Sequence, residues 1–289
     1  MANQTSVNGQ VTDAVKEQGT GTNTKPIRVL VVGAKGKMGR ETVKAVMNDS
    51  ELTFVGAVDR TLNGDTVGEV LGFDCGDAVF SNDLRQAILA TNADVMVDFT
   101  NPSSVKANIE QAIEFGVRPV VGTTGMTPEE IKKWDNDCKA ANIGGLIAPN
   151  FAIGAILMMR FSQMAARYLP HVEIIEMHHD QKLDAPSGTA TKTLELIAQE
   201  REAMGQGHPN EHETIAGSRG GDYEGMRVHS VRLPGYVAHQ QVIFGGLGQT
   251  LTIRHDSINR ESFMPGVVMS CKMVMNYEGM VYGLENLLD

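Results

Sequence analysis

Hydrophobic residues in the first half of the chain form short runs separated by amphipathic segments. The run at 27–33 (IRVLVVG) is continuous and rich in β-branched residues, which is typical of a strand buried on both faces. The segment at 40–49 places Val43, Val46 and Met47 at helical spacing. Further strands are predicted at 52–60, 93–100, 119–125 and 143–150, and further helices at 83–90, 103–115 and 128–142. Alternating strands and helices predict an α/β domain with a doubly wound parallel sheet.

The pattern changes after residue 150. An apolar segment at 152–169 predicts a long helix, in which we expect Met158, Met159 and Met164 to fill the core. A strand, a helix and a polar loop are then predicted at 171–179, 189–200 and 201–225. The remaining segments predict an antiparallel hairpin from 227–235 and 239–246, a third strand at 249–257 and a last helix at 263–275. The second half therefore predicts an α+β domain with an open mixed sheet.

Composition narrows the class of protein. The formal net charge is −10 without a block of Lys or Arg, which disfavours nucleic acid as a partner. Cys75, Cys138 and Cys271 have no disulfide or zinc-finger spacing, which favours a reducing compartment. Residues 1–24 are polar and lack the apolar core of a secretory signal, and no stretch resembles a membrane span. We expect a cytoplasmic protein that binds no membrane, with a disordered N-terminal tail at 1–24.

A glycine loop follows the first strand. Gly33, Gly36 and Gly39 are spaced G-x-x-G-x-x-G between a strand and a helix, and Asp59 ends the next strand. Glycine lets a backbone approach a pyrophosphate, and an acid at the end of the second strand can bind ribose hydroxyls. This context predicts a dinucleotide site. The ends of the other strands carry Phe99, Thr100, Gly122, Thr123 and Asn150, which are either ligand contacts or ordinary turn residues.

The second half contains the run EMHHDQKLDAPSGTA at 176–190. Adjacent histidines in an extended segment point to opposite sides, so His178 and His179 rarely bind one metal ion, and we expect no metal site. One packed and one exposed histidine is the structural alternative. In the third interpretation, Lys182 and the helix opening at Ser187, Gly188 and Thr189 attract an anion, while a histidine or lysine delivers a proton. This interpretation predicts a small acidic substrate.

These motifs together resemble the 4-hydroxy-tetrahydrodipicolinate reductase family, also called dihydrodipicolinate reductase. The family pattern E-x-H-H-x-x-K-x-D-A-P-S-G-T-A is matched at every fixed position, and GAKGKMGR, DFTNP, VGTTG and PNFAIG follow the family's order and spacing. The resemblance covers residues 26–289. It implies a Rossmann-type dinucleotide-binding domain at 25–150 and 260–289, and a substrate-binding domain at 151–259 whose open sheet builds a homotetramer.

The resemblance also implies roles for single residues. His178 and Lys182 would be catalytic and exchange protons near the reacting ring, His179 would bind substrate, and Ser187, Gly188 and Thr189 would hold a carboxylate. Arg260 resembles an arginine between the domains and receives no role. The cofactor would contact residues at the strand ends, namely Gly33, Ala34, Lys35, Gly36, Lys37, Met38, Asp59, Arg60, Phe99, Thr100, Gly122, Thr123, Thr124, Pro149, Asn150, Phe151 and Ala152.

The implied activity is the NAD(P)H-dependent reduction of 4-hydroxy-tetrahydrodipicolinate, a small dicarboxylate, in diaminopimelate and lysine biosynthesis. Asp59 favours NADH, whereas Arg60, Lys35, Lys37 and Arg40 favour the 2′-phosphate of NADPH, so we expect both to work with a preference for NADPH. One alternative is another two-domain NAD(P) reductase, such as an aspartate or homoserine dehydrogenase. Another is a nucleotide-sensing protein without turnover.

Overall fold

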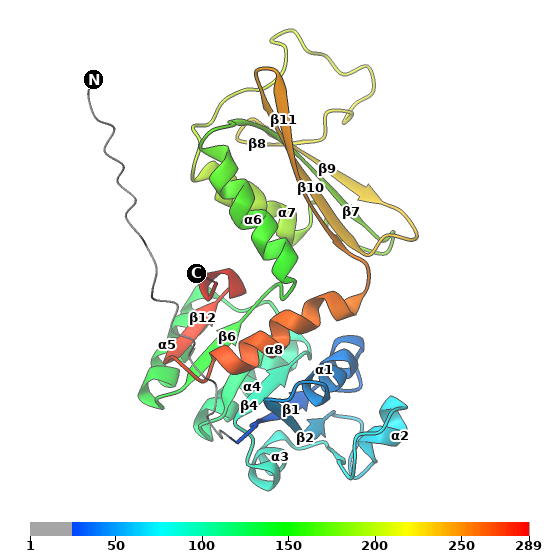
Figure 1. Ribbon diagram of the computed structural model, residues 1–289, viewed down its shortest axis with the longest axis vertical. Coiled ribbons are helices and arrows are strands. Elements are labelled where there is room, and N and C mark those ends of the chain that lie inside the picture. Colours follow the sequence, from blue (N-terminus) through cyan, green and yellow to red (C-terminus); the bar gives the residue numbers. More distant parts are fainter. Residues whose placement is uncertain (1–24, 289) are drawn as a thin grey trace, which may run out of the picture.

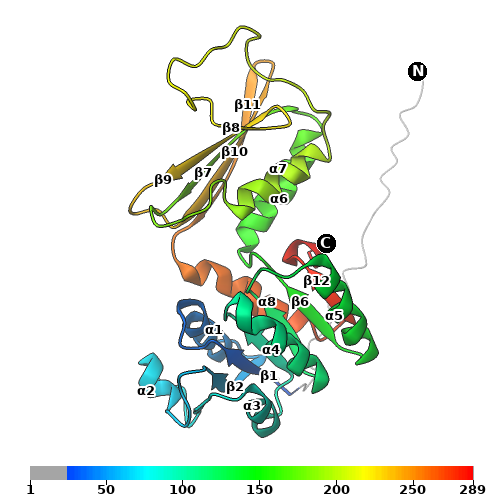
Figure 2. The same ribbon diagram turned by 180° about the vertical axis from the view of Figure 1, so that it is seen from behind.

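The computed structural model describes residues 25–288, which fold into two lobes (Figures 1 and 2). The predicted tail at 1–24 lies outside the described residues. The first lobe contains a seven-stranded parallel sheet in the order β12-β6-β5-β4-β1-β2-β3. Its strands are β1 (Ile27–Val32), β2 (Leu52–Val58), β3 (Phe80–Ser81), β4 (Val95–Asp98), β5 (Arg118–Val121), β6 (Gly144–Ile147) and β12 (Gly279–Tyr282).

Helices cover both faces of this sheet, which explains the continuous hydrophobic runs. Val29 and Val31 of β1 pack into one core, and Leu30 and Val32 into another on the opposite face. The helices are α1 (Lys37–Met47), α2 (Val67–Leu71), α3 (Leu84–Thr91), α4 (Pro102–Glu114), α5 (Pro128–Ala140) and α8 (Met264–Met273). The predicted doubly wound fold is confirmed. The short β3, α2 and β12 were not predicted, because two to five residues carry no periodic signal.

The second lobe is a mixed sheet in the order β11-β10-β7-β9-β8, with two helices against it (Figure 1). Its elements are α6 (Ile153–Ala166), β7 (His171–His178), α7 (Gly188–Ala198), β8 (Gly221–Tyr223), β9 (Met226–Arg232), β10 (Ala238–Gly246) and β11 (Gln249–Ser257). Single 3-10 turns follow at Arg260–Phe263 and Leu284–Asn286. The predicted α+β lobe with an open mixed sheet is also confirmed.

The predicted hairpin from 227–235 and 239–246 is wrong. β7 lies between β9 and β10, parallel to β9 and antiparallel to β10. The hairpin is instead formed by β10 and β11, which only Leu247 and Gly248 separate, and Gly248 has a φ of +70°. The connection from β9 to β10 contains Pro234 and Gly235 and is long enough to cross β7. Strands that are neighbours in sequence are therefore not partners in this part of the sheet.

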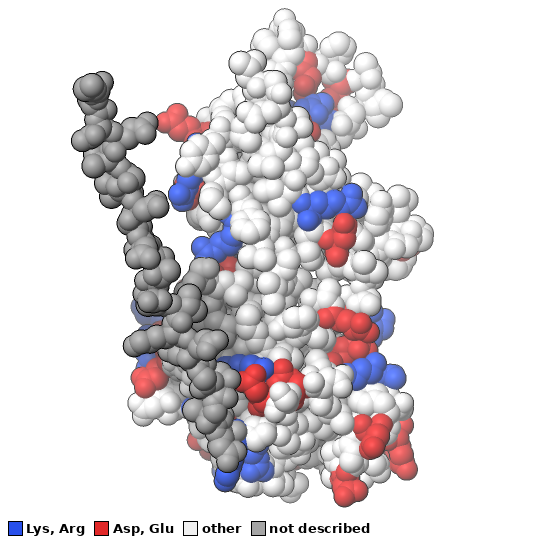
Figure 3. Space-filling model, viewed as in Figure 1, with Lys and Arg blue, Asp and Glu red and all other residues white. Residues whose placement is uncertain are grey.

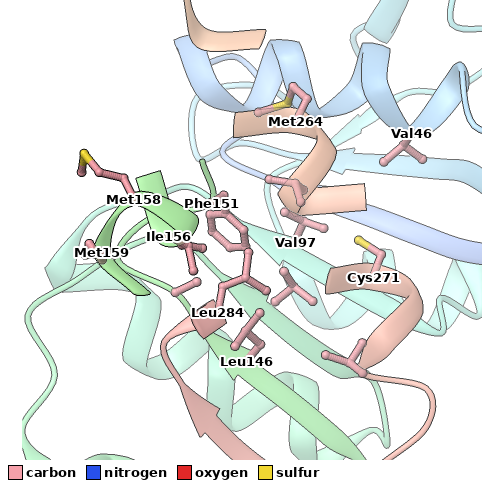
Figure 4. Close-up of a cluster of buried hydrophobic side chains, with 14 of the residues drawn as sticks. Val46, Val97, Leu146, Phe151, Ile156, Met158, Met159, Met264, Cys271 and Leu284 are labelled. Carbon is pink, nitrogen blue, oxygen red and sulfur yellow. The ribbon is translucent and has the colours of Figure 1, made fainter. Parts of the chain in front are cut away.

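The chain passes between the lobes twice, before α6 and after β11. Figure 4 shows Phe151, Ile156 and Leu284 lying together near Met264 of α8, so the start of α6 joins the core of the first lobe. Met158 and Met159 are buried as predicted. Met164 is 54% exposed, so its assignment to the core was wrong, because the apolar residues of α6 surround the helix instead of lying on one face.

On one face of the molecule, charged side chains of both signs lie close to one another (Figure 3). On the face seen in Figure 3, acidic and basic side chains lie interspersed among neutral ones. Among residues 25–288, no helix is long and apolar enough to cross a membrane. The three cysteines are free and buried.

Candidate active site

The predicted cofactor residues lie along one edge of the parallel sheet. They follow the carboxyl ends of β1, β2, β4, β5 and β6, and these five strands are neighbours in the sheet. From β1 the chain runs outward through β2 to β3, then returns to β4 on the other side of β1 and continues through β5 to β6. Such a reversal opens a crevice at the strand ends, where ligands bind in open α/β sheets.

The glycine loop fits a pyrophosphate. Gly33 has a φ of +77°, and a Cβ on Gly39 would lie 2.2 Å from the Gly33 oxygen, so both positions require glycine. Gly36 is the N-cap of α1 and makes no side-chain capping bond, so the first N–H groups of the helix receive no protein side chain there. Lys35 and Lys37 beside them are exposed. A close backbone approach and free N–H donors are what a dinucleotide site needs.

A buried aspartate holds the loops after β4 and β5 together. Asp98 has no exposed surface, and its carboxylate accepts hydrogen bonds from Thr100 N–H and O–H, Asn108 Nδ2 and Thr123 O–H. Burial raises the pKa of Asp98, against the lowering effect of these donors. The hydroxyls of Thr100 and Thr123 and the backbone N–H of Thr100 are therefore engaged within the protein.

Aromatic packing completes this edge. Gly122 lies against the ring of Phe99, since a Cβ there would come within 2.1 Å of that ring. Phe99 packs edge to face on Phe151 with centroids 5.7 Å apart. Phe151 is 2% exposed, so the residue belongs to the core and presents almost no surface to a cofactor.

A cavity of about 750 Å³ lies between the lobes. From the first lobe, Thr124, Pro149, Asn150 and Ala152 line it. From the second lobe, it is lined by His178, Lys182, Ser187, Gly188 and Thr189. The structure thus brings together the predicted catalytic residues, the predicted carboxylate site and part of the predicted cofactor site. The glycine loop, Asp59 and Arg60 lie outside this cavity, and so does His179, which is exposed and accepts a bond from Lys182 N–H through its carbonyl oxygen.

His178 is oriented by a buried acid. Its Nδ1 lies 2.5 Å from Oε2 of Glu176, whose side chain is completely buried. Burial raises the pKa of Glu176, but hydrogen bonds from His178 and Arg232 outweigh this effect and lower it to about 2. An ionised carboxylate only accepts hydrogen bonds, so Nδ1 carries a proton in this contact. Nε2 is then the nitrogen that remains to exchange a proton in the cavity.

The turn after β7 places cationic and N–H donors in the same cavity as His178. Lys182 Nζ lies 2.7 Å from Asp184 Oδ1, and the lysine side chain is one-fifth exposed. Ser187 caps α7 by accepting from Ala190 N–H at 3.2 Å, which leaves its hydroxyl proton to donate. A Cβ on Gly188 would meet no atom within 4 Å. The helix therefore opens onto free space, as a site for a carboxylate requires.

One side chain of the first lobe reaches across the cavity. Asn150 Nδ2 donates to Thr189 Oγ1 at 3.3 Å, while its Oδ1 accepts from Ala152 N–H at 2.8 Å. Thr189 is in turn linked to β10, because Gln240 donates to the Thr193 hydroxyl, and this hydroxyl donates to the Thr189 carbonyl. Asn150 was predicted as a cofactor contact, and in the structure its side chain contacts Thr189 of the second lobe.

Several residues of the site were missed. Glu176 belongs to the motif but received no role, and Arg232 lies far along the chain in β9. His239, Gln240 and His255 line the cavity from β10 and β11. Burial lowers the pKa of His255, and His239 Nδ1 lies 2.6 Å from Asp256. Only the register of the sheet, which pairs Gln240 with both Glu176 and His255, brings these residues together.

Arg260 lies outside the cavity between the lobes. It lines a separate hollow of about 460 Å³ with residues from the exposed side of α1, including Lys37, Arg40 and Lys44. Arg40 and Lys44 also pack over the ring of Phe73, at 5.8 and 5.4 Å from its centroid. Arg260 begins the turn that follows β11, so it lies at the second crossing between the lobes.

Comparisons with known proteins agree with this geometry. The sequence matches the family description "Dihydrodipicolinate reductase, N-terminus" over residues 27–151 and "Dihydrodipicolinate reductase, C-terminus" over residues 154–288. A 4-hydroxy-tetrahydrodipicolinate reductase of Halalkalibacterium halodurans is 56% identical over 263 residues, which are 91% of this chain and 100% of the relative. The reductase of Desulfitobacterium hafniense is 54% identical and covers 92% and 100%.

Comparison with solved structures supports the same family. A dihydrodipicolinate reductase from Paenisporosarcina sp. TG-14 with bound dipicolinate has a TM-score of 0.83 and 49% identity, covering 91% of this chain and 100% of that one. An amine dehydrogenase from Mycobacterium smegmatis, with a TM-score of 0.63 and 15% identity over 90% of this chain and 95% of its own, shares the fold alone. The resemblance found in the sequence is confirmed, and the chain belongs to the dihydrodipicolinate reductase family.

Proposed function

We propose that this chain reduces 4-hydroxy-tetrahydrodipicolinate in the cavity between the lobes, with His178 and Lys182 as its catalytic residues. Family membership makes it an NAD(P)H-dependent oxidoreductase that carries out the reduction step of diaminopimelate and lysine biosynthesis. The observation that carries the assignment of the site is the convergence of His178, Lys182 and the opening of α7 on one cavity with the strand ends of the nucleotide lobe. Dipicolinate bound to a relative supports a small dicarboxylate as the substrate.

The chemistry divides between cofactor and protein. The substrate loses its hydroxyl as water, which leaves an α,β-unsaturated imine in the ring. A reduced nicotinamide, when bound, supplies the hydride that this ring accepts at C4. The neighbouring carbon then takes a proton, for which His178 Nε2 and Lys182 Nζ are the donors that face the cavity. Ser187, Gly188 and Thr189 hold one carboxylate at the N-terminus of α7. His179 would reach the substrate only if the turn after β7 moved.

The free space at Gly188 gives a test of the carboxylate site. We expect Gly188→Ala to leave the free energy of unfolding within about 0.5 kcal/mol of wild type, because the new Cβ meets no protein atom. The methyl group would instead occupy space meant for the substrate and lower kcat/KM by about ten- to a hundredfold, mainly through KM.

Steady-state kinetics and chemical denaturation together check this expectation. Gly205→Ala is the matched control, because a Cβ there also meets nothing within 4 Å and Gly205 lies outside the cavity. An unchanged KM for the substrate in Gly188→Ala would show that no carboxylate binds at this helix opening.

Cofactor choice is the second part of the proposal. Asp59 Oδ1 already accepts from Thr61 N–H and O–H, at 3.1 and 2.9 Å, so part of its hydrogen-bonding capacity is used. Lys35 and Arg60 are exposed beside the ends of β1 and β2, where they could meet a 2′-phosphate. We propose that both NADPH and NADH are used, with NADPH preferred. A ratio of kcat/KM values that favours NADH by about tenfold or more would show that Asp59 dominates.

One assay separates the candidate functions. Oxidation of NADPH by the purified full chain should require freshly prepared 4-hydroxy-tetrahydrodipicolinate and should not occur with aspartate semialdehyde alone. Oxidation of NADPH with aspartate semialdehyde would instead indicate a homoserine dehydrogenase, and oxidation with oxaloacetate and ammonium would indicate an aspartate dehydrogenase. Cofactor binding without turnover of any of these compounds would indicate a nucleotide-sensing protein.

The second lobe also offers a surface for self-association. Leu157, Phe161, Met164 and Tyr168 follow helical spacing and are 40–80% exposed, and β11 is an edge strand of nine residues. We propose that residues 151–259 bind substrate and build a homotetramer, while residues 25–150 and 260–289 bind the cofactor. Sedimentation equilibrium at micromolar concentration tests the tetramer, and a monomer would contradict it. A cytoplasmic location, where the three cysteines would stay reduced, completes the proposal.

A further inference from the structure

A buried ion pair lies directly behind His178. Glu176 and His178 are two positions apart on β7 and so point to the same face of the sheet. The Glu176 carboxylate contacts His178 Nδ1 at 2.5 Å, Arg232 Nη2 at 2.7 Å and Arg232 Nη1 at 3.0 Å. Arg232 is opposite His178 in the parallel pairing of β9 with β7. The rigid centre of the sheet therefore fixes all three side chains.

The same pair also holds the turn that carries Lys182. Arg232 Nη2 donates to the carbonyl oxygen of Asp184 at 2.8 Å, and Asp184 is the partner of Lys182. At the far end of the turn, Ser187 N–H donates to Glu176 Oε1 at 3.3 Å. One carboxylate and one guanidinium thus contact His178, the turn of Lys182 and the opening of α7, which are the three protein parts of the proposed reaction.

Stability alone gives little reason for such a pair. Removing two charges from water costs several kcal/mol per ion, and well-packed hydrophobic residues often replace a buried pair without loss. The Glu176 side chain has no exposed surface, and that of Arg232 is one-fifth exposed. An acceptor that stays ionised, together with a fork of donors, is instead suited to fixing the direction of other polar groups.

We propose that Glu176 and Arg232 are positioning residues, with Glu176 fixing the Nδ1–H tautomer of His178 and Arg232 holding the turn of Lys182. This inference rests on the proposed roles of His178 and Lys182. Neither positioning residue lines the cavity, so both act through the groups that do.

Two variants separate the two parts of the pair. Glu176→Gln keeps the shape of the side chain but removes the charge, and it should lower kcat by about ten- to a hundredfold, the range for a partner behind a functional side chain. The cofactor Kd should not change. Arg232→Lys keeps a cation for Glu176 but cannot reach both Glu176 and Asp184, so it should mainly raise the KM for the substrate.

Nitrogen-15 NMR of the histidine rings gives a measurement that a purely structural role would not change. In wild type, the neutral form of His178 should carry its proton on Nδ1. In Glu176→Gln, a form with the proton on Nε2 should become populated, while Arg232→Lys should keep the wild-type tautomer. Glu173→Gln is the matched control, because Glu173 lies on the same strand and also pairs with an arginine and a histidine, Arg219 and His229, outside the cavity.

The outcomes distinguish this inference from the function on which it rests. If His178→Gln loses turnover but Glu176→Gln keeps full kcat and the wild-type tautomer, the positioning role is wrong and the proposed function stands. If His178→Gln itself keeps full turnover, the function of His178 is wrong. Should Glu176→Gln fail to fold, the wild-type spectrum still decides, because an Nε2–H tautomer of neutral His178 overturns the inference.

Discussion

Replacing His178 by glutamine should lower kcat by about two to four powers of ten, which is the usual scale for a lost general acid or base. Glutamine is similar in length and keeps a polar group in the cavity, but it cannot exchange a proton at neutral pH. The Kd for NADPH should stay within about twofold of wild type, because His178 lies at the end of β7 in the second lobe and not at the strand ends of the first. Steady-state kinetics and calorimetric titration with NADPH measure the two quantities.

His171→Gln is the matched control for this substitution. His171 begins the same strand, is exposed and lies outside the cavity, so its replacement should change neither kcat nor the Kd. A kcat for His178→Gln close to that of wild type would remove His178 from the reaction and leave Lys182 as the only proton donor among the predicted residues.

Replacing Gly39 by alanine should weaken NADPH binding by about a hundredfold. The new Cβ would lie 2.2 Å from the Gly33 oxygen and 2.6 Å from the Ala34 Cα, which are both backbone atoms that cannot rotate away. The glycine loop must therefore move, and a displacement of about 1 Å typically costs on the order of a hundredfold in function. Overpacking should also lower the free energy of unfolding by about 1–3 kcal/mol. Calorimetric titration and urea denaturation check both effects.

The control for Gly39 is again Gly205→Ala, where a Cβ meets no atom and α1 is not involved. Unchanged NADPH affinity in Gly39→Ala would mean that the loop after β1 does not contact the pyrophosphate. A loss of stability without a loss of affinity would have the same meaning, since it would restrict the role of Gly39 to the packing of α1.

Local sequence patterns predicted most of the fold, and the failures have a common cause. Strands such as 27–33 are marked by their own residues, because a buried parallel strand must be apolar on both faces. Strand pairing, in contrast, depends on residues far apart. β9 pairs with β7 and not with its neighbour β10, and no residue within β9 records this choice. Met164 shows the same limit, since apolar character alone does not say which side of α6 faces the core.

The residues of the candidate site likewise fall into those that a local motif predicts and those that depend on strand pairing. His178, Lys182 and Ser187 lie within one short segment, so a local motif was enough to propose them. Glu176 stood in that motif, two positions before His178, and the alternation of a strand could have placed it behind the histidine. Arg232 could not be found in this way, because its contact with Glu176 exists only through the register of β7 and β9. The arginine that pairs with the buried Glu176 can therefore be identified only when the order and register of the strands are known.

The last strand of the first lobe comes from the end of the chain. β12 pairs with β6 at the edge of the parallel sheet and packs against α5, while α8 lies against α1 and β1. During synthesis on the ribosome, the edge of β6 that pairs with β12 therefore stays unpaired until the whole second lobe has been made. We expect the nascent second lobe, whose strands all lie within one continuous segment, to fold before the lobe that emerges first.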